Sequence, residues 1–251
     1  MSALLPDAVA PLGALALIVL SFFTSALTAA VGIGGGVVLL AAMTFVFPPI
    51  ALVPVHGVVQ LGSNTGRAIV LAKNVSLRLI VPYALGAVVG AVIGGMLVVE
   101  LPEATILLAI GVTILITTWL KMPPLGRGER GVLAVGGLFA TILTMFVGAT
   151  GPFVMMMLRQ AGLPHARLVA THAMAMVVQH GLKVLAFVAL GFAFADWAPL
   201  MATMIVAGFG GTLVGARLLH KLPEATLKKA LNIVLTVISI QLIVRALADL
   251  I

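Results

Sequence analysis

Charged side chains and cysteine are what this sequence has least of. Charged residues make up 8% of the 251 residues, and cysteine is absent, whereas about a quarter of an ordinary soluble domain is charged. So few charges cannot cover the surface of a water-soluble fold. The composition therefore excludes a soluble globular enzyme, a nucleic-acid-binding protein and a disordered chain. The absence of cysteine excludes disulfides and thiolate metal sites.

Acidic side chains are absent from every long apolar stretch. The seven acids fall at predicted helix ends or loops: Asp7, Glu100, Glu103, Glu129, Asp196, Glu224 and Asp249. Carboxylates within a bilayer usually bind coupling cations or relay protons. Their absence, with Arg67 and Lys183 kept inside apolar stretches, predicts an anion as the permeant species. An inside-negative potential expels such a charge with about 2.3 kcal/mol per 100 mV, although His172 or His180 can take up a proton near neutral pH, which leaves coupling open.

Long uncharged runs are what the sequence does have, and apolar residues make up 62% of it. Such runs predict an all-α polytopic membrane protein, and they do not alternate as the strands of a membrane barrel do. The net charge of +7 fits cytoplasmic loops, so we expect the lipid bilayer and a small anion as partners and no nucleic acid. The first run, 8–23, lacks the basic start of a signal peptide, so we interpret it as part of the fold.

The chain contains two copies of one unit. Leu-Pro-Glu-Ala-Thr stands at 101–105 and again at 222–226, an offset of 121 residues. Other positions match in register, at an offset of 121 late in each half and 116 earlier: Gly90 with Gly211, Gly94 with Gly215, Gly32 with Gly148, Gly35 with Gly151, Pro48 with Pro164, His56 with His172, Arg67 with Lys183, Ser25 with Thr141, and Thr28 with Thr144. One five-residue insertion reconciles the offsets, which predicts an N-terminal repeat at 1–122 and a C-terminal repeat at 130–251.

Equivalent loops of the two halves carry opposite charge. The loop containing Lys73 and Arg78 is positive and its counterpart near Asp196 is negative, while the acidic loop 100–103 matches a basic loop at 220–229. Because positive loops stay in the cytoplasm, this predicts two inverted-topology repeats, as in many secondary transporters. A chance distribution of a few charges is the alternative. The expected crossings are 54–72, 79–99 and 104–120 in one half, and 168–190, 197–219 and 226–247 in the other.

Each half opens with an apolar stretch that glycines interrupt. The stretch 11–47 is broken at 32–36 and the stretch 131–158 at 148–152. The segments after the breaks are short for a crossing of about 20 residues, so we interpret both stretches as re-entrant hairpins; full crossing by both arms is the alternative. A glycine turn before a helix start lets N–H groups converge on an anion, although glycine also serves close helix packing. The candidate cradle residues are Gly34, Gly35, Gly36, Gly148, Thr150 and Gly151.

The helix after each hairpin carries a polar stripe. Its members fall on one helical face: His56, Gln60, Ser63, Asn64 and Arg67 in the first half, and Thr171, His172, Gln179, His180 and Lys183 in the second. Buried ionisable groups in membranes usually mark a pathway, which makes candidate substrate-binding residues of Gln60, Asn64, Arg67, His172, Gln179, His180 and Lys183. Alternatively, Arg67 snorkels to the cytoplasmic face, and His56 and His172 anchor loops or gate.

The two breaks, the stretch 61–65 (Leu-Gly-Ser-Asn-Thr) and His172 after the second break resemble the TauE/SafE sulfite exporter family over nearly the whole chain. The resemblance implies a bacterial inner-membrane transporter that exports sulfite, sulfoacetate or another small organosulfur anion. We expect no catalytic residue, cofactor or metal. This chain has Thr150 and Pro152 where the first break has Gly34 and Gly36, so its second cradle offers fewer N–H groups.

Two other functions and one assembly question stay open. A structural or assembly subunit without transport would tolerate apolar replacement of the polar stripes. An intramembrane enzyme would need a nucleophile–base pair or metal ligands, and His172 and His180 have no acid beside them. The small-residue spacing of Gly86, Gly90 and Gly94 permits close helix contact within one protomer or between two, so a homodimer is compatible with the sequence.

Three crossings in each of two inverted halves predict that both termini are extracytoplasmic. A reporter enzyme that is active only in the cytoplasm should therefore be silent when fused after Ile251, and a reporter that is active only outside should be active there. Cytoplasmic activity of the fusion would contradict this topology without contradicting the duplication.

Overall fold

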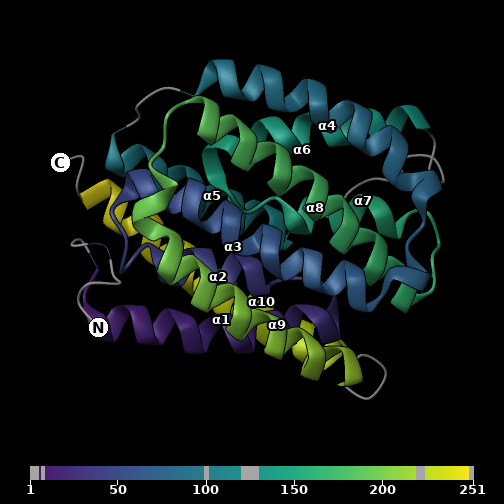
Figure 1. Ribbon diagram of the computed structural model, residues 1–251, viewed down its shortest axis with the longest axis horizontal. Helices are drawn as coiled ribbons and strands as arrows, with labels where there is room; N and C mark the ends of the chain where they lie inside the picture. The colour runs from purple at the N-terminus through teal and green to yellow at the C-terminus, as the bar shows by residue number, and fades with distance from the viewer. Residues whose placement is uncertain (1–5, 7–8, 99–101, 120–129, 219–223, 249–251) are drawn as a thin grey trace.

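The computed structural model describes residues 6, 9–98, 102–119, 130–218 and 224–248. Every regular element in these ranges is helical: α1 Pro11–Val31, α2 Gly35–Met43, α3 Pro49–Val70, η2 Ala72–Asn74, α4 Leu77–Leu97, α5 Glu103–Trp119, α6 Arg130–Val147, α7 Gly151–Arg159, α8 His165–Ala189, η4 Phe194–Trp197, α9 Ala198–Leu218 and α10 Glu224–Ala248. The helices run lengthwise in one bundle (Figure 1). Within the described residues, five segments are long and apolar enough to cross a membrane. The predicted all-α membrane protein is confirmed.

The helix α3 differs from its expected bounds and from its apolar neighbours. It begins at Pro49, five residues before the predicted start, because proline fits the first turn of a helix. Although it has 22 residues, it is not among the five apolar segments. The reason is its polar stripe, which is buried inside the bundle. Likewise, α8 begins at His165 rather than at 168.

The two arms of each glycine-broken stretch are unequal. The first arms α1 and α6 have 21 and 18 residues, whereas α2 and α7 have nine each. Nine residues at about 1.5 Å each make a helix less than half as long as the roughly 30 Å hydrocarbon core. If Gly35 carried a Cβ, that atom would collide with Thr24 and Thr28 of α1. The start of α2 therefore lies directly against α1, and α2 folds back along it. The short second arms favour the re-entrant interpretation over full crossing by both arms, and this interpretation stays a prediction.

The chain reverses between α1 and α2 in three residues. Gly32 and Gly34 have φ angles of 96° and 100°, which glycine adopts without the steric cost that a Cβ imposes. The N–H of Gly32 donates to the carbonyl of Thr28 and ends α1, and α2 begins at Gly35. The second break has only Gly148 at positive φ, with a value of 77°.

The closest helix pairs join one half of the chain to the other. The helix α4 lies along α6, and α9 lies along α1. A Cβ on Gly90 of α4 would meet the backbone of Leu138, and a Cβ on Gly211 of α9 would meet the backbone of Phe22. Missing side chains thus let the helix backbones touch, which is how helices in membranes associate without a hydrophobic driving force. The stripe of Gly86, Gly90 and Gly94 is used within the protomer.

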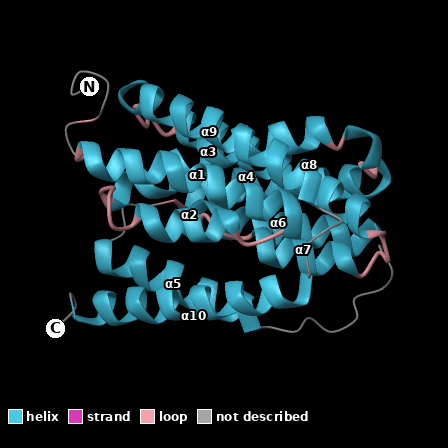
Figure 2. Ribbon diagram, turned by 90° about the horizontal axis from the view of Figure 1, so that it is seen from below, coloured by secondary structure: helices cyan, strands magenta, loops and turns pink. Residues whose placement is uncertain are grey.

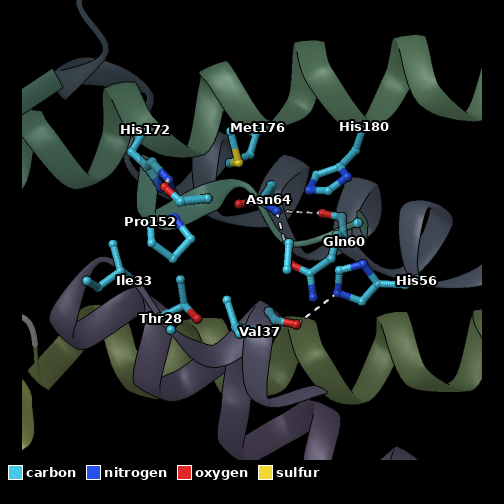
Figure 3. Close-up of a pocket in the computed structure, with 15 residues that line it drawn as sticks. Thr28, Ile33, Val37, His56, Gln60, Asn64, Pro152, His172, Met176 and His180 are labelled. Atoms are coloured by element: carbon cyan, nitrogen blue, oxygen red, sulfur yellow. Dashed lines mark hydrogen bonds between the residues drawn. The ribbon is translucent and has the colours of Figure 1, made fainter. Parts of the chain in front are cut away.

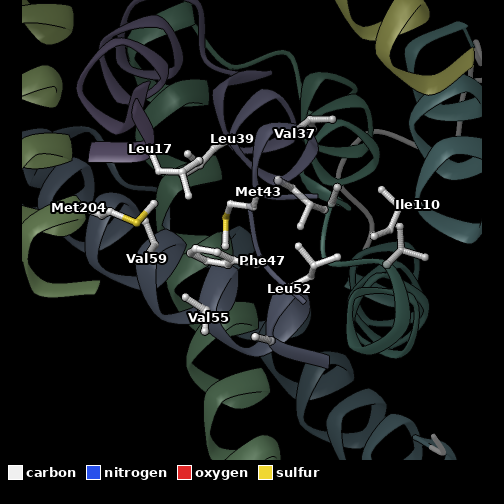
Figure 4. Close-up of a cluster of buried hydrophobic side chains, with 14 of the residues drawn as sticks. Leu17, Val37, Leu39, Met43, Phe47, Leu52, Val55, Val59, Ile110 and Met204 are labelled. Atoms are coloured by element: carbon white, nitrogen blue, oxygen red, sulfur yellow. The ribbon is translucent and has the colours of Figure 1, made fainter. Parts of the chain in front are cut away.

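Apolar side chains fill the space between α2 and its neighbours. Met43 of α2 is in contact with a core that includes Leu17 of α1, Val55 of α3, Ile110 of α5 and Met204 of α9 (Figure 4). The helices α5 and α10 lie side by side on one face of the bundle (Figure 2). The core therefore fixes the short helix α2 from several sides.

The start of α1 and the end of α10 lie at the same end of the bundle (Figure 1). This arrangement agrees with termini on one side of the membrane, and which side they occupy stays a prediction. The expected junction of the repeats, at 123–129, lies outside the described residues.

The glycine contacts between α9 and α1 predict a position-specific loss of stability. Gly211→Leu should lower the free energy of unfolding by at least about 1 kcal/mol, because overpacking a tight contact costs about 1–3 kcal/mol. The matched control is Gly131→Leu, since nothing lies within 4 Å of a Cβ there. Thermal unfolding of the purified proteins in detergent measures both. Equal melting temperatures for the two variants would show that the α1–α9 contact is looser than described.

Candidate functional site

A small cavity lies between the starts of α2 and α7, where side chains of α3 and α8 close around it (Figure 3). The centre of a water molecule can occupy about 30 Å³ of it, which is room for one or two waters. Its lining comes from both halves: Thr28, Ile33, Gly34, Gly36, Val37, His56, Gln60, Asn64, Gly148, Ala149, Gly151, Pro152, His172, Met176 and His180. The lining contains no acidic side chain.

The starts of two helices give the cavity a positive potential. The first N–H groups of a helix have no partner within it, and the first intrahelical bond of α2 runs from the N–H of Val38 to the carbonyl of Gly34. Gly36 and Val37, which line the cavity, precede that bond. In α7 the corresponding bond runs from Val154, and the proline before it has no N–H. Both helix dipoles favour an anion here, and α2 offers more donors.

Two histidines tie the short helices to the long ones. Nε2 of His56 lies 2.9 Å from the carbonyl oxygen of Gly36, and Nε2 of His172 lies 3.0 Å from that of Gly151. A carbonyl oxygen only accepts, so each Nε2 carries the proton and donates it. The Nδ1 atoms are buried without a partner. Both rings line the cavity. The same two side chains therefore hold the short helices in place and can contact an anion that is bound there.

Arg67 lies outside the cavity lining and contacts Asn64, which lines it. Its side chain is 1% exposed, so the snorkelling interpretation is wrong. One terminal nitrogen donates to Oδ1 of Asn64 at 2.9 Å, and the other lies 3.4 Å from Oγ of Ser63. Nδ2 of Asn64 then donates to the carbonyl of Gln60 at 2.7 Å. Because Arg67 occupies the amide oxygen, the NH₂ group of Asn64 is directed toward Gln60, where it also donates to Oε1 at 3.3 Å.

In the second half, the corresponding polar side chains bind the glycine break directly. Nε2 of Gln179 donates to the carbonyl of Ala140 at 2.6 Å and to Oγ1 of Thr150 at 2.8 Å. These two bonds hold the residue before α7 against α6. The helix α8 also carries Lys183, which is fully buried and whose Nζ has no hydrogen-bond partner.

The predicted site residues divide into two groups. Those around the cavity are Gly34, Gly36, Gln60, Asn64, Gly148, Gly151, His172 and His180. Those outside its lining are Gly35, Arg67, Thr150, Gln179 and Lys183. Gly35 belongs to the second group because its Cβ direction points at the α1 backbone, so it serves packing rather than the cradle.

Sequence reasoning did not include seven lining residues in the candidate set: Thr28, Ile33, Val37, His56, Ala149, Pro152 and Met176. The apolar ones carry no chemical signal. His56 had one, because it matches His172 in the repeat register, and Met176 stands at the position that matches Gln60. Extending every candidate to its repeat partner would have found both.

A comparison with family models matches residues 17–242 to the family described as Sulfite exporter TauE/SafE. The matched range contains both breaks and every residue that lines the cavity. No curated protein and no solved structure gives a significant match.

The glycines at the two helix starts predict separable effects. Gly151→Val should remove protection by sulfite against thermal unfolding, because a Cβ there has ordinary 3.7 Å contacts with His172 and Met176 and the added methyls enter the cavity. Gly35→Ala should instead lower the melting temperature without sulfite, because its Cβ would meet the backbone of Thr24. Full sulfite protection of a folded Gly151→Val protein would place the site elsewhere.

Proposed function

Because the chain belongs to the TauE/SafE sulfite exporter family, we propose that it exports sulfite or a small sulfonate such as sulfoacetate across a bacterial inner membrane. The cavity between the starts of α2 and α7 is the binding site. The observation that carries this proposal is the meeting of two helix starts in a lining without any acid, which is an arrangement that favours an anion and disfavours a cation.

The donors around the cavity suit an oxyanion with several oxygens on one atom. Main-chain N–H groups at Gly36 and Val37 precede the first hydrogen bond of α2, and the side chain of Asn64 lies between the helices that surround the cavity (Figure 3). A space of about 30 Å³ has room for one or two waters, so an oxyanion, and any carbon chain attached to it, needs a wider cavity. The proposal therefore includes movement of the helices around the site.

The two halves supply that movement if they are inverted repeats. Equivalent contacts support this part of the proposal. The bond of His56 to Gly36 has its counterpart in the bond of His172 to Gly151, and the α4–α6 pair has its counterpart in α9–α1. Each half thus contributes one broken hairpin, and the cavity lies where the two meet, as in transporters that alternate access around a fixed site.

Two basic side chains complete the proposed pathway. Arg67 lies near the end of α3 that leads to the basic loop at Lys73, and Lys183 lies near the opposite end of the pathway on α8. Both are fully buried. A basic group on each side of the cavity stabilises an anion that is bound between them.

Sulfite flux from proteoliposomes tests the proposal. Arg67→Gln should reduce the flux about tenfold or more, equivalent to at least about 1.4 kcal/mol, because Asn64 loses the group that orients it. Arg67→Lys should retain part of the activity, since it keeps the charge but loses the planar fork. Lys73→Gln is the matched control, because it removes an exposed positive charge near the same end of α3. Absence of flux in the wild-type protein favours a structural subunit over an exporter, whereas wild-type flux in Arg67→Gln contradicts the role of Arg67 in orienting Asn64.

A further inference from the structure

Three basic side chains meet beside the cavity without a carboxylate. The rings of His56 and His180 are 6.0 Å apart and nearly perpendicular, and both line the cavity. Lys183 follows His180 by three residues, which places both on one face of α8. It lies against Gly57 of α3, where a Cβ would be 2.8 Å from Cε of Lys183 and 3.6 Å from its Nζ.

The surroundings of Lys183 offer no counter-charge among the described residues. The other titratable or charged groups on the elements packed against α8 are His56 and Arg67 on α3, Lys73 in η2, Arg78 and Tyr83 on α4, Arg130 on α6 and Arg159 on α7, with His165, Arg167, His172 and His180 on α8 itself. None of them is a carboxylate. His180 lies one helical turn before Lys183, and His56 precedes Gly57, which contacts the Lys183 side chain.

An ammonium that is fully buried without a partner is costly, because it has lost its hydration and gained no opposite charge. The amine of Lys183 is therefore neutral when the cavity holds no anion. An anion in the cavity provides the missing counter-charge. From this geometry we propose that Lys183 takes up a proton when the anion enters, so that the protein carries one anion and one proton together.

This inference rests on the proposed anion export and adds its ion coupling. The proton comes from water on the side where the anion enters, binds the lone pair of Nζ, and returns to water when the anion leaves. On uptake an O–H bond of hydronium breaks as the N–H bond forms, and on release the N–H bond breaks as a water molecule takes the proton back. Arg67 has a different role, since a guanidinium stays charged and its nitrogens already donate to Asn64 and Ser63. Arg67 is thus permanently charged, whereas the charge of Lys183 depends on whether the cavity holds an anion.

Titration calorimetry of the purified protein tests the coupling. Methanesulfonate and sulfoacetate are the probes, because their acidic groups stay ionised near pH 8. Binding heats in buffers of different ionisation enthalpy should report uptake of about one proton per anion. Lys183→Gln should abolish the uptake and weaken binding, whereas Lys183→Arg should bind without uptake because its charge is permanent. Arg67→Gln is the control, since it should weaken binding and leave the uptake unchanged.

A second measurement needs only the wild-type protein. Because the free amine is neutral and the bound form is charged, binding consumes a proton and must weaken as the pH rises. The Kd for methanesulfonate should rise about tenfold per pH unit above neutrality. A pH-independent Kd, or equal heats in all buffers, overturns the coupling while leaving anion export intact. Uptake that survives Lys183→Gln but disappears in His180→Asn overturns the assignment to Lys183. Absence of binding by either probe and by sulfite overturns the proposed function as well.

Discussion

Main-chain N–H groups at two helix starts inside the bundle constrain the rest of this structure. Lipid cannot satisfy such groups, so they persist only within protein or beside a polar cavity. The long helices α1, α3, α6 and α8 surround the two starts, and the histidines on α3 and α8 hold the first turns of the short helices in place. The cavity, its positive potential and its lack of acids all follow from the need to enclose these ends.

The two helix starts are equivalent in position and are held by different hydrogen bonds. Before α7, Thr150 is tied to Gln179 and through it to α6. Before α2, Gly34 has no side chain to tie, and the position that matches Gln179 is Ser63, which bonds Ser25 of α1 instead. Side-chain hydrogen bonds therefore hold the second break against α6. The first break has no such side-chain bond before its helix, and the side chain of Gln60 beside it accepts from Nδ2 of Asn64 at 3.3 Å.

The sequence was sufficient for the class of fold, the two breaks and the polar stripes, because hydropathy, glycine position and helical period are one-dimensional signals. It was insufficient for the direction in which each residue points. Gly35 and Gly36 are neighbours in the sequence, yet one position meets the α1 backbone and the other meets the side chain of Gln60. Similarly, the stripe that contains Arg67 did not show that its guanidinium reaches Asn64 instead of the surface. Such distinctions depend on helix rotation, which only packing between distant segments determines.

The contact between α1 and α9 also has a consequence for biosynthesis. During translation, α1 enters the bilayer long before α9 has been made, and the carbonyls of Phe22 and Ala26 that later lie against glycines of α9 face lipid or an insertase in the meantime. Ser25, whose hydroxyl lies beside Gly208, is exposed in the same interval. The N-terminal hairpin therefore matures only after most of the chain has left the ribosome, and its assembly is post-insertional rather than sequential.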